Sequence, residues 1–365
     1  MGGRPGLERA GVVAVIALLT AATGCSGGAP RDAGPHATSA GSPASPSGTG
    51  AAQSGVGKAP SGAGTAPAGT AGPVPSAGGS AGQAQGNAAA APPGAAAAGS
   101  AVLIGAGDIA TCEGSADDRT AALVAAQPGT VFTLGDNAYP DGTAADFQRC
   151  YGPGWGRFRG RTRPAPGNHE YHVAGAAPYF AYFGRAAGPR GRGYYSYNVG
   201  GWHVVVLNTN CGAVAGGCRT GSPQQRWLRA DLAASGARCT VAIVHHPLFT
   251  SVARHPPDTA TRPLVRTLYA AGAELLLAGH NHTYERFAPQ DADGRSDPAR
   301  GIRAFVVGTG GAPLHTFGRR AAHSQVRNDR TFGVLKLTLS AGAYRWQFLA
   351  VPGSHFTDSG GGTCH

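Results

Sequence analysis

Five short segments of the chain each end at a polar residue that can bind a metal ion. Four are apolar runs, AVLIGAG (101–107), TVFTLG (130–135), TVAIV (240–244) and AELLLAG (273–279), and the fifth, RPAPG (163–167), is less apolar. Near-continuous apolar runs of this length are typical of strands buried on both faces of a sheet. The pattern therefore predicts a strand at each place, with RPAPG the weakest of the five.

Segments of helical character lie between several of these runs. SADDRTAALVAA begins at Ser115, PQQRWLRADLAAS follows Ser222, and RPLVRTLYAA ends before Gly272. Serine is a favoured N-cap residue and glycine a common stop signal after a helix. Strands alternating with helices predict an α/β sheet. Near the C-terminus, residues 331–351 read as an antiparallel hairpin.

The polar residues that follow the five segments are expected to meet, because ligands of α/β sheets bind beyond the carboxyl ends of the strands. Each residue alone would be interpreted as a turn or cap residue, and only their joint occurrence predicts a site. Seven donors exceed the four ligands of tetrahedral zinc, but they suit two octahedral ions that share a carboxylate. The seven are Asp108, Asp136, Tyr139, Asn168, His245, His280 and His282.

The order GDIA, GDNAY, GNHE, VHHP, GHNHTYER resembles the calcineurin-like metallophosphoesterases, and within them the purple acid phosphatases. The resemblance covers most of residues 100–352. It implies an α/β fold, a four-layer αββα sandwich of two mixed β-sheets. It also implies one ion held by Asp108, Asp136, Tyr139 and His282, and a second held by Asp136, Asn168, His245 and His280, with Asp136 bridging.

One exchange within these motifs points to the purple acid phosphatase branch. Many metallophosphoesterases carry GDxH, in which the histidine binds the first ion, and here Ala110 occupies that position. Tyr139 stands three residues after Asp136, as in the GDxxY pattern of purple acid phosphatases. A phenolate prefers a hard trivalent ion. The resemblance therefore implies Fe(III) in the first site and a divalent Zn, Mn or Fe ion in the second.

The function implied is a phosphatase that hydrolyses phosphomonoesters by attack of a metal-activated hydroxide, with Asp136 as the shared ligand. His169, next to Asn168, is the first candidate to protonate the leaving alkoxide. His246, next to His245, is the second, and a buried structural role is its alternative. Two other functions stay open: a phosphodiesterase or nucleotidase that uses the same ions, and a non-catalytic protein that binds phosphate or a wall polymer.

The N-terminal part of the chain has a different composition. Residues 1–25 resemble a secretory signal, with a basic start, a short apolar core and a lipobox-like end at Cys25; ordinary cleavage nearby is the alternative to lipidation. Residues 26–99 are almost entirely Gly, Ala, Ser, Pro and Thr, which predicts a disordered tether. Residues 100–365 would then form the catalytic domain, secreted or anchored as a lipoprotein to the outer face of the cell membrane.

The cysteines are consistent with export. Of the seven in the chain, six remain after Cys25 is set aside, the even number that a disulfide set in an exported domain needs. Six cysteines allow 15 pairings. We favour three pairs, of which only the second is supported by its spacing: Cys112–Cys150, Cys211–Cys218 and Cys239–Cys364.

The chain is basic, with a net charge of +11 at pH 7. A basic balance favours anionic partners, such as a phosphorylated small molecule or polymer, although solubility of an arginine-rich chain explains the charge equally well. No basic-aromatic module of known type predicts specific nucleic-acid binding. The sequence sets no oligomeric state.

Overall fold

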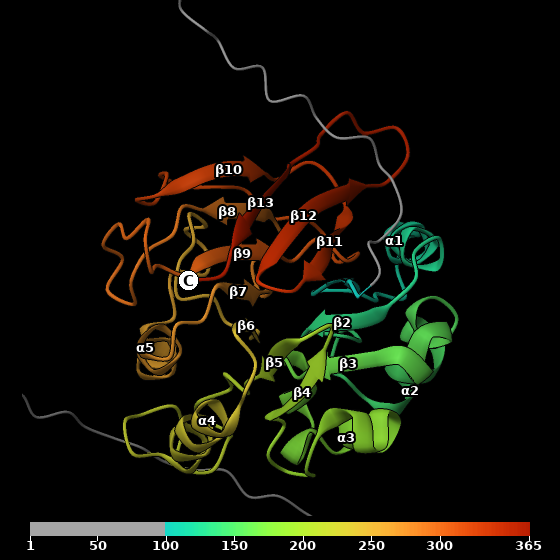
Figure 1. The fold of residues 1–365 in the computed structure, drawn as a ribbon. Helices are drawn as coiled ribbons and strands as arrows, with labels where there is room; N and C mark the ends of the chain where they lie inside the picture. Colours follow the sequence, from blue (N-terminus) through green and yellow to red (C-terminus); the bar gives the residue numbers. More distant parts are fainter. Residues whose placement is uncertain (1–98) are drawn as a thin grey trace, which may run out of the picture. The chain divides into compact units, whose positions relative to one another are not determined.

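The computed structural model describes residues 99–365, shown in Figure 1. The signal, the lipobox-like end and residues 26–98 of the expected tether lie outside the described residues. Two sheets form the centre, one of six strands in the order β13-β12-β11-β1-β2-β3 and one of seven in the order β10-β8-β9-β7-β6-β5-β4. Within residues 99–365, no helix is long and apolar enough to span a membrane.

Both sheets contain parallel and antiparallel strand pairs. The first sheet comprises β1 (Ala101–Ala106), β2 (Thr130–Leu134), β3 (Thr162–Ala165), β11 (Gly333–Ser340), β12 (Ala343–Ala350) and β13 (Ser359–Thr363). The second comprises β4 (Tyr195–Val199), β5 (Trp202–Val206), β6 (Cys239–Ile243), β7 (Leu275–Ala278), β8 (Tyr284–Phe287), β9 (Arg303–Val307) and β10 (Ser324–Asn328). The α-helices are α1 (Ala116–Ala125), α2 (Ala144–Asp146), α3 (Ala177–Phe183), α4 (Pro223–Ala234) and α5 (Arg262–Ala270).

All five segments that the sequence predicts as strands are strands. RPAPG, the weakest of them, lies mostly within β3, which pairs in parallel with β2. The predicted C-terminal hairpin is formed by β11 and β12, which pair antiparallel along their whole length. The α/β fold with two mixed sheets is therefore confirmed.

Side-chain alternation along the strands builds the four layers. On β5, Val204 and Val206 belong to the apolar core between the two sheets, whereas Val205 packs with Leu228 of α4 and Leu268 of α5. Successive side chains of a strand point to opposite faces, so one buried strand supplies both cores. Helices α4 and α5 cover one face of the second sheet, and α1 to α3 lie beside the first sheet (Figure 1).

The predicted helix caps are only partly present. The Ser222 hydroxyl accepts a hydrogen bond from the Gln225 amide at 3.2 Å and caps α4. The expected side-chain cap at Ser115 is wrong, because its side chain makes no cap hydrogen bond and only its carbonyl accepts from the Arg119 amide. Helix α1 is held instead by its packing against the first sheet.

The three predicted disulfides are confirmed, and each fixes a different part of the domain. Cys239–Cys364 joins the first residue of β6 to the C-terminal end of the chain beyond β13, so it ties the two sheets together. Cys211–Cys218 closes the loop that leads from β5 to α4. Cys112–Cys150 joins the loop after β1 to the π-helical segment Phe147–Tyr151 that follows α2.

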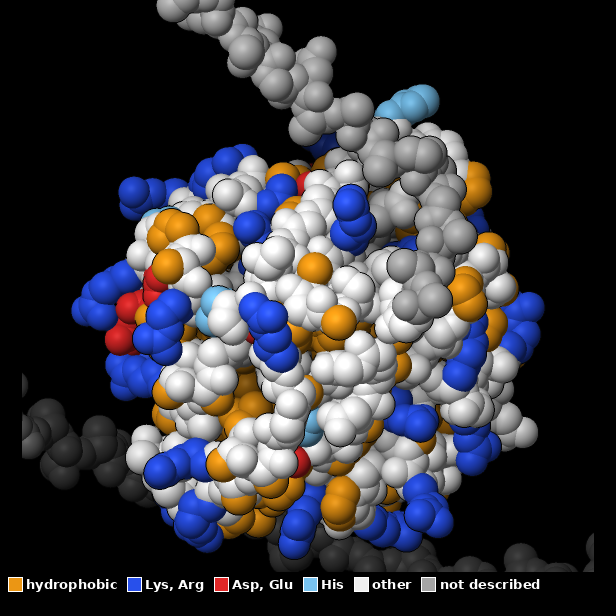
Figure 2. All heavy atoms as spheres, viewed as in Figure 1, with side chains coloured by type: hydrophobic (Ala, Val, Ile, Leu, Met, Phe, Trp, Pro, Cys, Tyr) orange, Lys and Arg blue, Asp and Glu red, His pale blue; other side chains and the backbone are white. Residues whose placement is uncertain are grey.

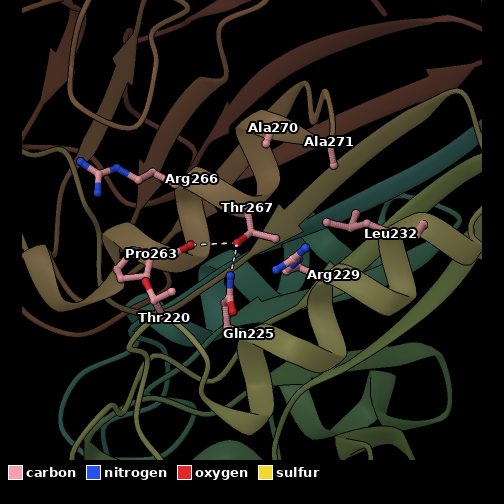
Figure 3. A pocket seen from close by; sticks show the side chains of 10 residues that line it. Thr220, Gln225, Arg229, Leu232, Pro263, Arg266, Thr267, Ala270 and Ala271 are labelled. Carbon is pink, nitrogen blue, oxygen red and sulfur yellow. Dashed lines mark hydrogen bonds between the residues drawn. The ribbon is translucent and has the colours of Figure 1, made fainter.

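A hollow of about 570 Å³ lies between α4 and α5, on the outer face of the second sheet (Figure 3). Within it, Gln225 donates to the Thr267 hydroxyl at 3.0 Å, and that hydroxyl donates to the Pro263 carbonyl at 2.9 Å. None of the seven predicted metal ligands lines this hollow. It is therefore separate from the site described below.

On the face drawn in Figure 2, the basic side chains are spread widely. Figure 2 shows Lys and Arg distributed over the whole visible face of the described residues, without one concentrated patch. Such a surface attracts anions in general, but it does not form a continuous track for one polyanion.

Candidate metal centre

The structure brings all seven predicted ligands to one edge of the two sheets. Asp108 lies two residues beyond β1 and Asp136 two beyond β2, while Asn168 follows β3. His245 lies two residues beyond β6, and His280 and His282 follow β7. These loops meet because the strands that precede them are parallel and end at the same level.

The first ligand set converges on the Tyr139 hydroxyl. The Tyr139 Oη lies 3.2 Å from Asp108 Oδ1, 3.2 Å from Asp136 Oδ2 and 3.1 Å from His282 Nε2. The His282 Nδ1 donates to the Pro313 carbonyl at 2.7 Å, which leaves Nε2 without a proton when the ring is neutral. All four donor groups can therefore face one cation.

The second ligand set converges on Asn168. Its Oδ1 lies 3.0 Å from His245 Nε2 and 2.9 Å from His280 Nδ1. The His245 Nδ1 donates to the Leu134 carbonyl at 2.7 Å, so its Nε2 is also free to bind a cation. The Asp136 Oδ2 completes the set, at 3.3 Å from His245 Nε2.

The spacing of these donor atoms fits metal coordination. Ligands about 2.1 Å from an octahedral ion lie about 3.0 Å from their neighbours. The donor separations given above are 2.9 to 3.3 Å. The same oxygen, Asp136 Oδ2, is within 3.3 Å of a donor from each set. The geometry therefore fits two ions that share Asp136.

Three of these ligands have a backbone conformation that side chains rarely adopt. Asp108, Asp136 and His280 have φ angles of 58°, 49° and 69°. Residues other than glycine in this left-handed region are uncommon and cluster at functional sites, where the surrounding structure compensates for the strain. The preceding glycines permit the tight approach: a Cβ at Gly135, for example, would lie 2.5 Å from His245 Nδ1.

Comparison with known proteins agrees with this geometry. Residues 102–284, half of the chain, match the calcineurin-like phosphoesterase family. The chain belongs to that family. It is similar to purple acid phosphatase 15 of Arabidopsis thaliana, with 29% identity over 230 residues that cover 53% of this chain and 42% of that protein. Probable purple acid phosphatase 20 of the same plant is 29% identical over 167 residues, 39% of this chain and 38% of the relative.

The matched part of this chain therefore spans less than half the length of those relatives. Solved structures show the same fold. The purple acid phosphatase PPD1 from yellow lupin (Lupinus luteus) seeds superposes with a TM-score of 0.60 at 18% identity, over 72% of this chain and 54% of that one. GAP50, the anchor in the inner membrane complex of Plasmodium, superposes with a TM-score of 0.55 at 12% identity, over 73% and 89%. The fold alone thus does not specify one activity.

The charges in the centre couple metal binding to protons. Burial alone would raise the pKa of Asp136, but the charges on His245 and His169 outweigh it and hold that pKa well below its ordinary value. Burial alone would lower the pKa of His245, but the charge of Asp136 outweighs it and raises the pKa to about 9. A cation that binds His245 must therefore displace a proton, so binding weakens in acid.

His169, the first general-acid candidate, lies beside the first ligand set. Its ring centroid is 4.4 Å from that of Tyr139, and its Nε2 is 3.8 Å from Asp136 Oδ2. Its Nδ1 contacts the Pro140 carbonyl, which requires a proton on that nitrogen. His169 can thus donate from Nε2 only as an imidazolium.

His246, the second candidate, lies beside the second ligand set, with its ring 4.5 Å from that of His280. The Thr209 hydroxyl accepts the backbone amides of His245 and His246 at 3.2 and 2.9 Å, so its own proton goes to His246 Nδ1 at 3.0 Å. This places the ring proton on Nε2. Burial lowers the pKa of His246 to about 3, so the ring is a neutral hydrogen-bond donor.

A buried carboxylate positions the loops that carry the shared ligand. Glu170 accepts hydrogen bonds from the backbone amides of Asp136, Asn137 and Gly167 at 3.0, 2.7 and 2.6 Å. Burial and the charge of Asp136 raise the pKa of Glu170 to about 7. Glu170 thereby joins the loop after β2 to the loop after β3, and it sets the position of Asp136 relative to Asn168.

Two further histidines lie over the centre, and neither belongs to a recognisable sequence motif. His315 stacks on His282 with ring centroids 3.9 Å apart, and His255 lies 4.7 Å from His280. His255 is carried by a loop whose start, Ser251, donates its amide to Glu285 at 2.8 Å. Their placement depends on these tertiary contacts, so the sequence carries no signal for it.

Proposed function

We propose that this phosphoesterase is a binuclear metal-dependent phosphatase that hydrolyses phosphomonoesters. The observation that carries the proposal is the position of Asp136 Oδ2, which is within 3.3 Å of a donor from each ligand set. A single-ion site has no need for seven converging donors, nor for a carboxylate shared between two groups of them. The similarity to purple acid phosphatases supports the same function.

In this proposal, Asp108, Asp136, Tyr139 and His282 hold one ion, and Asp136, Asn168, His245 and His280 hold the other. The ions would supply Lewis-acid activation of a water and neutralise charge on the phosphoryl group. Tyr139 can bind as a phenolate only beside a strongly charged cation, because burial and the charges of Asp136 and Asp108 raise its pKa well above the ordinary value. Fe(III) in the first site, with Zn, Mn or Fe(II) in the second, meets that requirement.

The side chains around the ions then have distinct tasks. His246 donates its Nε2 proton in a hydrogen bond to a phosphoryl oxygen, because Thr209 fixes its tautomer. His169 protonates the leaving alkoxide when it is an imidazolium. Glu170 maintains the spacing of the ligand loops. Replacing His169 with alanine should slow esters with poor leaving groups more than esters with good ones, and equal losses would contradict its role as the acid.

The test compares initial rates on a phosphate monoester and a matched diester, with protein loaded with iron and zinc or manganese. Asp136→Asn serves as the control because it removes the shared charge. Fast monoester hydrolysis that the control lacks would support the phosphatase. Cleavage of the diester alone would favour the phosphodiesterase or nucleotidase alternative, which uses the same ions.

A binding protein without catalysis is the alternative from another class. The relatives include a probable inactive purple acid phosphatase 9, 33% identical over 113 residues, 28% of this chain and 16% of the relative. The complete set of seven donors in this chain favours activity. Metal-loaded protein that binds phosphate but hydrolyses neither ester would support the binding protein instead.

We further propose that the protein acts outside the cell, either secreted or held by a lipid on Cys25. The three disulfides support an oxidising compartment, because such bonds are rare in the cytosol. Intact-mass analysis of the mature protein tests the anchor. A diacylated Cys25 as first residue would support it, and an unmodified N-terminus near that position would rule it out.

A further inference from the structure

A second hollow, of about 380 Å³, opens beside the proposed metal centre. Its lining includes Tyr171, Thr209, Asn210, His246 and Asp258. His246 connects it to the centre, since its ring packs against both His245, at 4.8 Å, and His280, at 4.5 Å. A molecule that presents a phosphoryl group to the ions therefore has room for its remaining part in this hollow.

The walls of the hollow are fixed before any ligand binds. Tyr171 accepts a hydrogen bond from the Asn208 side chain at 2.7 Å, and the Asn208 Oδ1 accepts the Asn210 amide at 3.1 Å. The Cys211–Cys218 disulfide closes the loop that forms one side. A preformed wall of this kind selects among ligands at low entropic cost.

Asp258 is the only charged side chain among the residues that line the hollow. Its backbone amide donates to the Pro247 carbonyl at 2.9 Å, and its Oδ1 accepts the Ala260 amide at 2.9 Å, so it is held in place from both sides. Within residues 99–365 it takes part in no ion pair. Its negative charge therefore acts on whatever enters the hollow.

We propose that this hollow is the leaving-group subsite of the phosphatase. Asp258 then selects monoesters whose leaving group is either cationic, or neutral and rich in hydroxyl groups. The inference rests on the proposed function. Among the uncharged lining groups, the Tyr171 hydroxyl can still donate and the Asn210 side-chain oxygen can still accept, which suits hydroxyl groups. A leaving group with its own carboxylate or phosphate would lie a few ångströms from the Asp258 carboxylate, at the edge of the protein. The repulsion between the like charges lowers the kcat/KM of that monoester about tenfold.

The test measures kcat/KM at pH 7 for three alkyl monoesters that differ in the charge of the leaving group: glycerol 1-phosphate, 3-phosphoglycerate and phosphoethanolamine. Asp258→Asn keeps an oxygen that can accept the Ala260 amide. It should raise kcat/KM for 3-phosphoglycerate about tenfold, lower it for phosphoethanolamine and leave glycerol 1-phosphate within about twofold. The inhibition constant of inorganic phosphate, which has no leaving group, should stay unchanged.

Two variants serve as checks. Asp118→Asn removes one negative charge from the exposed face of α1, outside the hollow. It should leave the kcat/KM values of the three esters, relative to one another, as in the native protein. Asp258→Ser is a second neutral variant whose hydroxyl can still accept the Ala260 amide, and it should show the same changes in kcat/KM as Asp258→Asn, so the test does not depend on the folding of one variant. Native protein that hydrolyses all three esters, with ratios unchanged in both Asp258 variants, would overturn the subsite and leave the phosphatase intact. Native protein inactive on every monoester would overturn both.

Discussion

Replacing Glu170 with glutamine tests how the two ligand loops are held together. The side chain is fully buried, and it accepts three backbone amides, two at Oε2 and one, from Asn137, at Oε1. Glutamine has the same shape but a single acceptor oxygen. Its amide group would therefore face the Asn137 amide, donor against donor, while the oxygen keeps the other two bonds.

The expected loss of stability follows from two opposing effects. Losing a hydrogen bond to a charged group costs about 1.5–3 kcal/mol, and leaving the Asn137 amide unpaired costs about 1–3 kcal/mol more. Against this, glutamine removes a buried charge whose cost is visible in the raised pKa, about 7. We expect a net destabilisation of about 1–3 kcal/mol for the metal-free protein, or a melting temperature lower by about 5 °C for a domain of this size. Metal affinity should fall about 10- to 100-fold, as it does when groups that orient ligands are changed.

The assay combines thermal unfolding of metal-free protein with metal occupancy measured against a competing chelator. Glu285→Gln is the matched control. Glu285 is also fully buried, but it accepts from Ser251 and contacts neither ligand loop that Glu170 joins. The control should lose stability and keep its metal affinity. Native-like metal affinity in Glu170→Gln would refute the positioning role. An equal loss of metal affinity in Glu170→Gln and Glu285→Gln would refute it as well.

Three further changes probe separate parts of the domain. Tyr139→Phe should abolish the visible phenolate band of iron-loaded protein, and a surviving band would disprove Fe(III) binding by that residue. Asp358→Asn should destabilise the protein by about 3–5 kcal/mol in chemical denaturation, because it leaves Arg286, bound at 2.7 Å, without its buried counter-charge; a loss under about 1 kcal/mol would contradict this. Burial raises the pKa of Glu274 to about 7. The contribution of Glu274 to the free energy of unfolding is therefore intact below about pH 4.5 and is lost as pH rises through 7. Glu274→Gln should therefore gain about 1–2 kcal/mol at pH 8 and almost nothing at pH 4.5, and equal melting-temperature gains at both pH values would argue against it.

Local patterns were sufficient to predict the parts of the fold whose residues are adjacent in sequence. The apolar runs predict β1, β2, β6 and β7, and the polar residue after each predicts a ligand, because strand and ligand lie within three residues of one another. The cap at Ser222 follows the same logic. The cap at Ser115 does not form, because its backbone, at φ −137° and ψ 18°, is not in the extended conformation that a capping residue usually adopts, and its residue type alone does not encode that conformation.

The residues that surround the centre are set by contacts between distant segments. His255 reaches it because the Asn281 side chain donates to the His255 carbonyl at 3.2 Å, across 26 residues of sequence, and because Glu285 fixes Ser251 across 34. The motif GHNHTYER supplies two proposed metal ligands, His280 and His282. It therefore also anchors the loop in which Asp258 lies, beside the neighbouring hollow. A change of substrate preference can arise within residues 252–262 without touching a proposed ligand, whereas a change at Asn281, between His280 and His282, alters both substrate preference and metal binding. This separation predicts that variation in selectivity will concentrate in the loop, and that variation in metal content will concentrate at the motif.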